Sequence, residues 1–133
     1  MTYLLDANTC IKFLNGQSES VRQRFEELPP SALALCSVVK AELFYGAMKS
    51  ARPQANLEKL LFFFDRFISY PVDDAAAEVC GRVRAQLAKQ GKPIGPNDLL
   101  IASVAISRQH TLVTHNVGEF SRVEGLALED WET

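Results

Sequence analysis

Histidine and cysteine are scarce in this sequence of 133 residues, which contains two histidines and three cysteines. Cys10, Cys36 and Cys80 are odd in number and far apart, and none of them lies in a CxxC or Cys/His spacing. Zinc ligation is therefore not expected. We interpret the three cysteines as reduced thiols in the core of a cytoplasmic protein.

A surplus of positive charge is absent as well. Fourteen lysines and arginines stand against sixteen acidic residues, which gives a net charge of −2. Proteins that bind nucleic acid mainly by neutralising phosphates carry a basic field, and this composition excludes one. Any contact with nucleic acid must come from local basic patches or from metal ions.

Long apolar runs are also absent. No segment approaches the roughly 18 unbroken apolar residues of a membrane span, and residues 1–16 carry no basic leader. We therefore expect neither export nor membrane insertion, and a cytoplasmic location. With 47% apolar and 23% charged residues and no repeat or linker, residues 1–133 are predicted to fold as one domain.

Short apolar segments alternate with longer amphipathic ones. Strands are predicted at residues 2–6, 32–37, 70–72, 111–114 and 126–131. Helices are predicted at residues 7–15, 18–28, 38–50, 54–69, 74–91 and 96–110, the second of them stopped by Pro29 and Pro30. This alternation predicts a three-layer α/β/α domain with a mostly parallel central sheet of about five strands. The last helix is almost wholly apolar and should be central.

Three carboxylates fall at positions that matter in such a fold, because sites form beyond the carboxyl ends of parallel strands. Asp6 follows the first strand and is either the N-cap of the next helix or a chemical ligand. Glu42 lies in a nearly apolar helix, facing either a cation or a salt-bridge partner such as Lys49. Asp98 follows Pro96 in a first helical turn, where the helix dipole alone favours an acid.

A fourth polar segment follows the strand at 111–114. Thr114 could hydrogen-bond an acid or a water, and His115 is better explained as a surface residue than as a base. Three carboxylates that converge on one sheet edge should repel each other unless a cation lies between them. Mg²⁺ or Mn²⁺ accept such oxygen ligands, and the natural reaction is then metal-assisted attack of water on a phosphodiester.

Four segments together resemble the sequence blocks of PIN-domain ribonucleases, specifically the VapC-type toxins of bacterial toxin–antitoxin pairs. They are "LLDANTCI", "AELFYGA", "GKPIGPNDLLIA" and "LVTHNVGEF", and the likeness extends over the whole chain to "LEDW". The resemblance implies an endoribonuclease that depends on Mg²⁺, with Mn²⁺ as a possible substitute. It implies hydrolysis of RNA, with transfer RNA or another structured RNA as substrate, and hence inhibition of translation.

The resemblance also implies roles for individual residues. Asp6, Glu42 and Asp98 match the acidic metal ligands of the family. Where many members carry a further acid, this chain has Asn116, with Glu119 one helical turn later, which leaves the number of metals open. The candidates for supporting residues behind the ligands are Asn8, Ser37 and Thr114. The candidates for substrate binding are Lys49, Arg52, Lys89 and Lys92.

Partners are implied in the same way. Toxins of this type are held inactive by an antitoxin, here of the VapB type, whose tail enters the groove and whose other part binds DNA. This chain shows no DNA-reading motif, so DNA would be reached only through the antitoxin. The segment "LLFFFDRF" (residues 60–67) has phenylalanines on more than one helix face. They are available for a homodimer or an antitoxin helix, or are buried in the core.

Three other interpretations are open to a test. "DANT" resembles the D-x-D-x-T opening of haloacid-dehalogenase-type phosphatases, although Asn8 replaces the second acid. A receiver domain is also a small α/β sheet, but it needs an acidic pair after the first strand and a late lysine, and no lysine follows Lys92. A PIN domain that binds RNA without cutting it would differ from the nuclease in needing no metal for its function.

Overall fold

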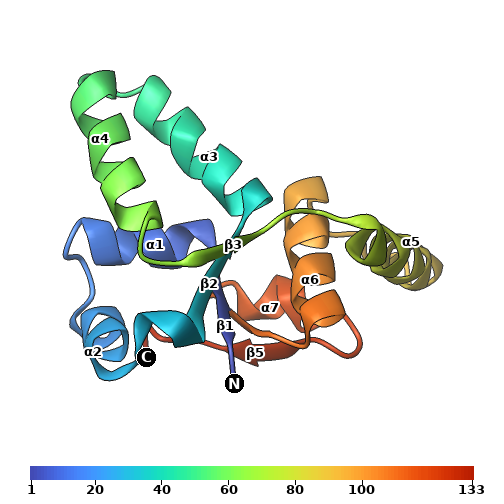
Figure 1. Cartoon of the computed structure of the whole chain (residues 1–133). Coiled ribbons are helices and arrows are strands. Elements are labelled where there is room, and N and C mark those ends of the chain that lie inside the picture. Colours follow the sequence, from blue (N-terminus) through green and yellow to red (C-terminus); the bar gives the residue numbers. More distant parts are fainter.

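The computed structural model describes all of residues 1–133 and has five strands in one sheet (Figure 1). The strands are β1 (Tyr3–Leu5), β2 (Leu33–Cys36), β3 (Ile68–Tyr70), β4 (Thr111–Val113) and β5 (Ala127–Glu129). Their order across the sheet is β3-β2-β1-β4-β5, and all neighbouring pairs are parallel. The carboxyl ends of the strands therefore meet at one edge.

Helices cover both faces of this sheet. They are α1 (Ala7–Leu14), α2 (Glu19–Glu27), α3 (Ser37–Met48), α4 (Pro53–Phe64), α5 (Asp74–Lys89), α6 (Pro96–Arg108) and α7 (Val117–Phe120). Helices α1 and α2 lie on one side and α5 and α6 on the other, while α3 and α4 form a pair that projects from the sheet (Figure 1). The predicted three-layer α/β/α fold is confirmed. None of these helices has the length and apolar character needed to cross a bilayer.

Helix α6 runs through the core, as its apolar sequence predicts. Residues 101–105 are all buried, so this segment meets apolar neighbours around its whole circumference. The helix begins at Pro96, whose fixed φ suits the first helical position and whose missing N–H leaves no donor unpaired there. Because its body is fixed in the core, α6 delivers its first turn, with Asp98, to a defined place.

The cysteines are all free, as expected. Cys10 and Cys36 are buried, and burial raises the pKa of both thiols. Cys80 is only partly buried. The interpretation as core thiols therefore holds for the first two, which remain protonated at neutral pH.

The predicted helix at 54–69 and strand at 70–72 have wrong boundaries. Helix α4 ends at Phe64, and β3 covers residues 68–70, where Ala34 pairs with Ile68 and Cys36 with Tyr70. Pro71 has no N–H to contribute to a strand ladder, so the strand precedes it. The pairing with β2 thus decides a boundary that helical periodicity alone places too late.

Helix α2 ends at Glu27, before the two prolines, as predicted. Strand β5 is shorter than predicted and covers only Ala127–Glu129. The short helix α7 is not predicted at all. It has only four residues, too few for a hydrophobic period to be visible in the sequence.

The phenylalanine-rich segment is divided between core and surface. Phe63 and Phe64 are buried, whereas Phe62 is 74% exposed. Leu61 is 52% exposed, because α4 turns Leu60, Phe63 and Phe64 toward the core instead. Both explanations offered for this segment are therefore correct: Phe63 and Phe64 are buried in the core, and Leu61 and Phe62 form an exposed apolar surface.

An aromatic cluster joins the segments beside the sheet. The rings of Phe13 and Phe25 are stacked with centroids 4.0 Å apart, and Phe63 lies 5.8 Å from Phe13. Near the C-terminus, Trp131 packs edge-on against Tyr3 at 5.5 Å. The guanidinium of Arg24 lies 5.1 Å from the centre of the Trp131 ring, a cation–π contact. The last residues are thereby packed onto the first strand.

Replacing Phe63 with alanine should lower the free energy of unfolding by roughly 3–5 kcal/mol, because it opens a cavity in the aromatic cluster. The matched change Phe62→Ala removes the same ring from an exposed position and should shift it by no more than about 0.5 kcal/mol. Urea denaturation followed by circular dichroism measures both. Equal losses in the two variants would contradict the assigned register of α4.

Candidate active site

Asp6 lies directly after β1 and is only 7% exposed. Its Oδ1 accepts a hydrogen bond from the Thr9 backbone N–H at 2.8 Å, so it is the N-cap of α1. The cap explanation is therefore correct. It does not exclude the ligand explanation, because a carboxylate has two oxygens and the cap uses one of them.

Glu42 lies on α3 and is partly buried. Burial raises its pKa, and the nearby charge of Asp6 raises it further. The salt bridge to Lys49 that would explain it structurally does not form; the Lys49 ammonium instead lies 4.8 Å from the centre of the Tyr45 ring. Glu42 lines a cleft of about 270 Å³ between α1, α3 and α4, and Gly46 lies beside it as the helical spacing predicts.

Asp98 lies in the first turn of α6, after the loop at 93–95. Its pKa is raised to about 6, first by burial, then by Glu119, and then by the charges of Glu42 and Asp6. A Cβ placed on Gly95 would lie 3.6 Å from Asp98 Oδ2 and 3.9 Å from Glu119 Oε1. The two carboxylates therefore converge in front of this glycine.

Glu119 comes from α7 and is held by donors on both of its oxygens. Oε1 accepts from the Gly95 backbone N–H at 3.0 Å, and Oε2 accepts from Asn116 Nδ2 at 2.7 Å. The Gly95 donor is the main reason that the pKa of Glu119 is lowered. Glu119 therefore stays ionised beside Asp98, whose pKa is raised.

We refer to Asp6, Glu42, Asp98 and Glu119 as the acidic cluster. Asp6 follows β1, Glu42 lies in the middle of α3, Asp98 lies in the first turn of α6 and Glu119 lies on α7. The charges of the other three all contribute to the raised pKa of Asp98. An all-oxygen set of partly buried carboxylates that repel each other fits a hard divalent cation.

The three supporting candidates are placed differently from one another. Thr114 is fully buried, and its Oγ1 accepts the Asn116 backbone N–H at 3.0 Å. It therefore orients the segment that carries Asn116 and does not contact an acid. Asn8 and Ser37 are exposed, and neither side chain makes a hydrogen bond with the protein.

The four basic candidates for substrate binding fall into two groups. Lys49 and Arg52 lie at the turn between α3 and α4, at the tip of the projecting pair (Figure 1). Lys89 ends α5, and Lys92 lies in the loop that leads to Asp98. All four are exposed, and none forms a salt bridge.

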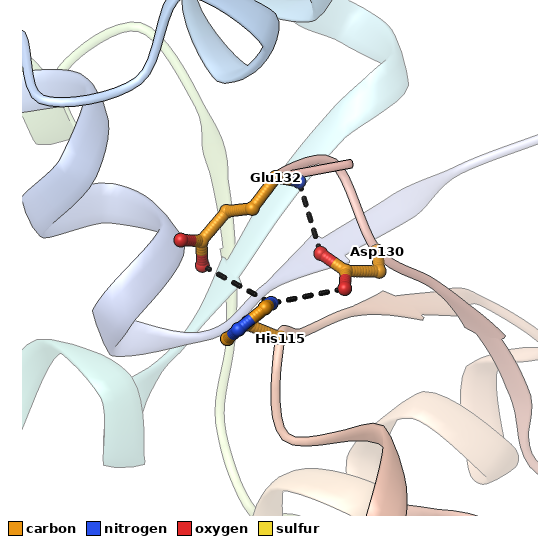
Figure 2. Close-up of side chains that lie close together, drawn as sticks. All are labelled: His115, Asp130 and Glu132. Carbon is orange, nitrogen blue, oxygen red and sulfur yellow. Dashed lines mark hydrogen bonds and ion pairs between the residues drawn. The ribbon is translucent and has the colours of Figure 1, made fainter.

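His115 belongs to a second group of titratable side chains, with Asp130 and Glu132 (Figure 2). Its Nδ1 lies 2.9 Å from Asp130 Oδ2 and 3.9 Å from Glu132 Oε2. Lys12 lies 3.8 Å from the other oxygen of Glu132 and already supplies a cation there. With its side chain 63% exposed, His115 is a surface residue, as predicted. Its contacts and the Lys12–Glu132 ion pair attach the C-terminal segment to the end of β4 and to α1.

Known proteins resemble this chain over nearly its whole length. Residues 3–126 match the model of the PIN domain. The chain is 44% identical to the tRNA(fMet)-specific endonuclease VapC of Shigella flexneri and 39% identical to ribonuclease VapC2 of Rickettsia felis, covering 98–99% of each protein in both cases. It superposes on the toxin in the DNA-bound VapBC structure from Salmonella typhimurium with a TM-score of 0.92, at 39% identity over 98% of both chains.

This chain belongs to the PIN-domain family. Within that family it is a member of the VapC ribonucleases, because the likeness extends over nearly the whole length of both proteins. The resemblance expected from the four sequence blocks is confirmed. The interpretations as a haloacid-dehalogenase-type phosphatase and as a receiver domain are wrong.

The acidic cluster should lower the stability of the metal-free protein at neutral pH. The folded-state pKa of Asp98 is about 6, above its ordinary value of 3.8, so the folded protein binds this proton more tightly than the unfolded chain. Stability is therefore lost as the pH rises through 6 and Asp98 ionises beside other carboxylates. In EDTA, Asp98→Asn should melt above wild type at pH 7.5, with a smaller difference at pH 5.

Thermal unfolding at the two pH values measures this effect. Asp65→Asn is the matched control, because it removes one carboxylate from an exposed position at the end of α4. A melting difference between Asp98→Asn and wild type that does not change with pH would contradict the raised pKa.

Proposed function

We propose that this chain is a Mg²⁺-dependent endoribonuclease that hydrolyses phosphodiester bonds in RNA through the acidic cluster. The observation that carries the proposal is the convergence of four carboxylates at the carboxyl edge of a parallel sheet. Membership of the VapC ribonucleases supports it.

Asp6, Glu42 and Asp98 are the residues that would hold the metal, and Mn²⁺ is the alternative to Mg²⁺ because both prefer oxygen ligands. When bound, such an ion polarises the phosphate and makes water a better nucleophile. The chain itself supplies the orientation. The cap on Thr9 fixes the Asp6 carboxylate, and the buried body of α6 fixes that of Asp98.

Asn116 stands where many family members carry a further acid, and its contacts suggest how this chain compensates. Asn116 donates to Glu119, so Glu119 provides the negative charge and Asn116 orients it. Ordered carboxylates of this kind depend on such hydrogen bonds from outside the ligand set. We therefore include Asn116 and Glu119 in the active site, the first as a positioning residue.

The proposed substrate is transfer RNA or another structured RNA. A relative of 44% identity is named as an endonuclease specific for tRNA(fMet), which supports this substrate class. Lys49, Arg52, Lys89 and Lys92 are proposed to contact RNA from the two sides of the acidic cluster. Cleavage of such RNAs would inhibit translation and would take place in the cytoplasm, where they are found.

The proposed partner is a VapB-type antitoxin that neutralises the enzyme, and DNA would be reached only through that complex. Solved relatives are complexes of the VapBC type, some bound to DNA, which supports both points. Exposed apolar side chains on α1, α3 and α4 offer surface to a protein partner, including a second copy of this chain; they are Ile11, Tyr45, Met48, Leu61 and Phe62.

Purified chain free of antitoxin should convert total transfer RNA into discrete fragments with Mg²⁺ but not with EDTA. Asp98→Asn should lower the cleavage rate at least a hundredfold, because it removes one charge from the proposed metal ligands. The control Asp65→Asn should cleave like wild type. Denaturing gels of a time course measure all three proteins.

If transfer RNA binds but stays intact with both Mg²⁺ and Mn²⁺, the chain is a PIN domain that binds RNA without cutting it. Equal cleavage by wild type and Asp98→Asn would show that the acidic cluster does not take part in the reaction.

A further inference from the structure

The loop at 93–95 is held by two side chains, one on α7 and one that follows α7 by two residues. Glu119 Oε1 accepts the Gly95 N–H at 3.0 Å, and Arg122 Nη1 donates to the Pro93 carbonyl oxygen at 3.4 Å. The Arg122 backbone N–H also donates to the Glu119 carbonyl oxygen at 3.3 Å, so the two residues, three positions apart, belong to one turn of the chain. The Arg122 guanidinium and the Glu119 carboxylate therefore contact groups only two residues apart in the same loop.

The position of Arg122 is fixed from a second direction. Gln86 Nε2, on α5, donates to the Arg122 carbonyl oxygen at 3.2 Å. After the Gly95 and Asn116 donors, the charge of Arg122 also contributes to the lowered pKa of Glu119. Its guanidinium therefore lies on the side of the acidic cluster that carries Glu119.

The guanidinium of Arg122 is available to a ligand. The residue is exposed, forms no salt bridge, and engages one of its five N–H donors, in the long contact to Pro93. Three other arginines are already occupied by carboxylates: Arg22 with Glu19 and Glu26, Arg24 with Glu129, and Arg108 with Asp73. A free guanidinium is the side chain best shaped to bind a phosphate through two N–H groups.

A polyanion that approaches the acidic cluster meets repulsion from four carboxylates on a chain whose net charge is −2. A cation at the rim of the cluster offsets that repulsion where the RNA strand must enter. We propose that Arg122 binds a backbone phosphate of the RNA strand beside the acidic cluster, from the side of the loop at 93–95. Lys92, directly before Pro93, continues the positive charge along the same loop. This inference rests on the proposed function.

The test is the salt dependence of RNA binding, measured without cleavage. Fluorescence anisotropy in EDTA, over a series of salt concentrations, compares total transfer RNA binding to wild type and to Arg122→Gln. Loss of one phosphate contact should lower the slope of log affinity against log salt by about one. It should weaken binding roughly tenfold, the size of one hydrogen bond to a charged group. Arg122→Lys should keep the slope and recover part of the affinity.

Arg66→Gln is the matched control. Arg66 is exposed and precedes β3, so it lies at the amino edge of the sheet, opposite the acidic cluster. The change removes the same charge and should leave the slope unaltered. Thermal melting of each variant checks the fold, which should persist because both arginines are exposed.

A slope for Arg122→Gln equal to that of wild type would overturn the proposal. An equal decrease in Arg66→Gln would overturn it too, since only net charge would then matter, and so would the absence of RNA binding by wild type. Cleavage of the same RNA with Mg²⁺ separates the two proposals. If wild type cleaves the RNA but Arg122→Gln keeps the wild-type slope, only the role of Arg122 is refuted. If Arg122→Gln lowers the slope but wild type does not cleave, only the proposed nuclease activity is refuted.

Discussion

Mutual repulsion among the carboxylates of the acidic cluster is the constraint on which the rest of this structure depends. Asp98 keeps a raised pKa because it is partly buried and because Glu119, Glu42 and Asp6 lie near it, and no salt bridge within the chain neutralises the group. Such an arrangement persists only where other interactions hold each acid in place. The buried α6 holds Asp98, the α1 cap holds Asp6, and the Gly95 and Asn116 donors hold Glu119. Stability is thus given up locally for a site that attracts a cation.

The places of Asp6, Glu42 and Asp98 in the acidic cluster could be predicted because each stands out among its neighbours in the sequence. Asp6 ends a short apolar strand, Glu42 interrupts an apolar helix, and Asp98 follows a helix-starting proline. Once strands and helices alternate, a parallel sheet gathers strand ends at one edge, so proximity follows from the order of elements. The same reasoning explains why the α/β class and the central place of α6 are readable from the sequence.

The remaining features depend on contacts between segments distant in sequence. The boundary of α4 is decided by the pairing of β3 with β2. Arg122 has no local mark of importance; only the folded chain brings its side chain to Pro93 and its backbone to Gln86. Likewise, the sequence allows Asp6 to be interpreted either as a helix cap or as a ligand. The structure shows that the cap uses only one carboxylate oxygen, so the other is available to a ligand.

The strand order has a further consequence for how the chain folds during synthesis. β1, made first, pairs with both β2 and β4, and Tyr3 receives Trp131 from the far end. Such non-local pairing gives the domain a high contact order, so closure of long loops precedes most of the stabilising contacts. A nascent chain has neither Glu119 nor the Trp131 contact until residues 119 and 131 have been made. The ribosome that makes this protein therefore carries an incomplete sheet until then, and the acidic cluster comes together only after Glu119 has been translated.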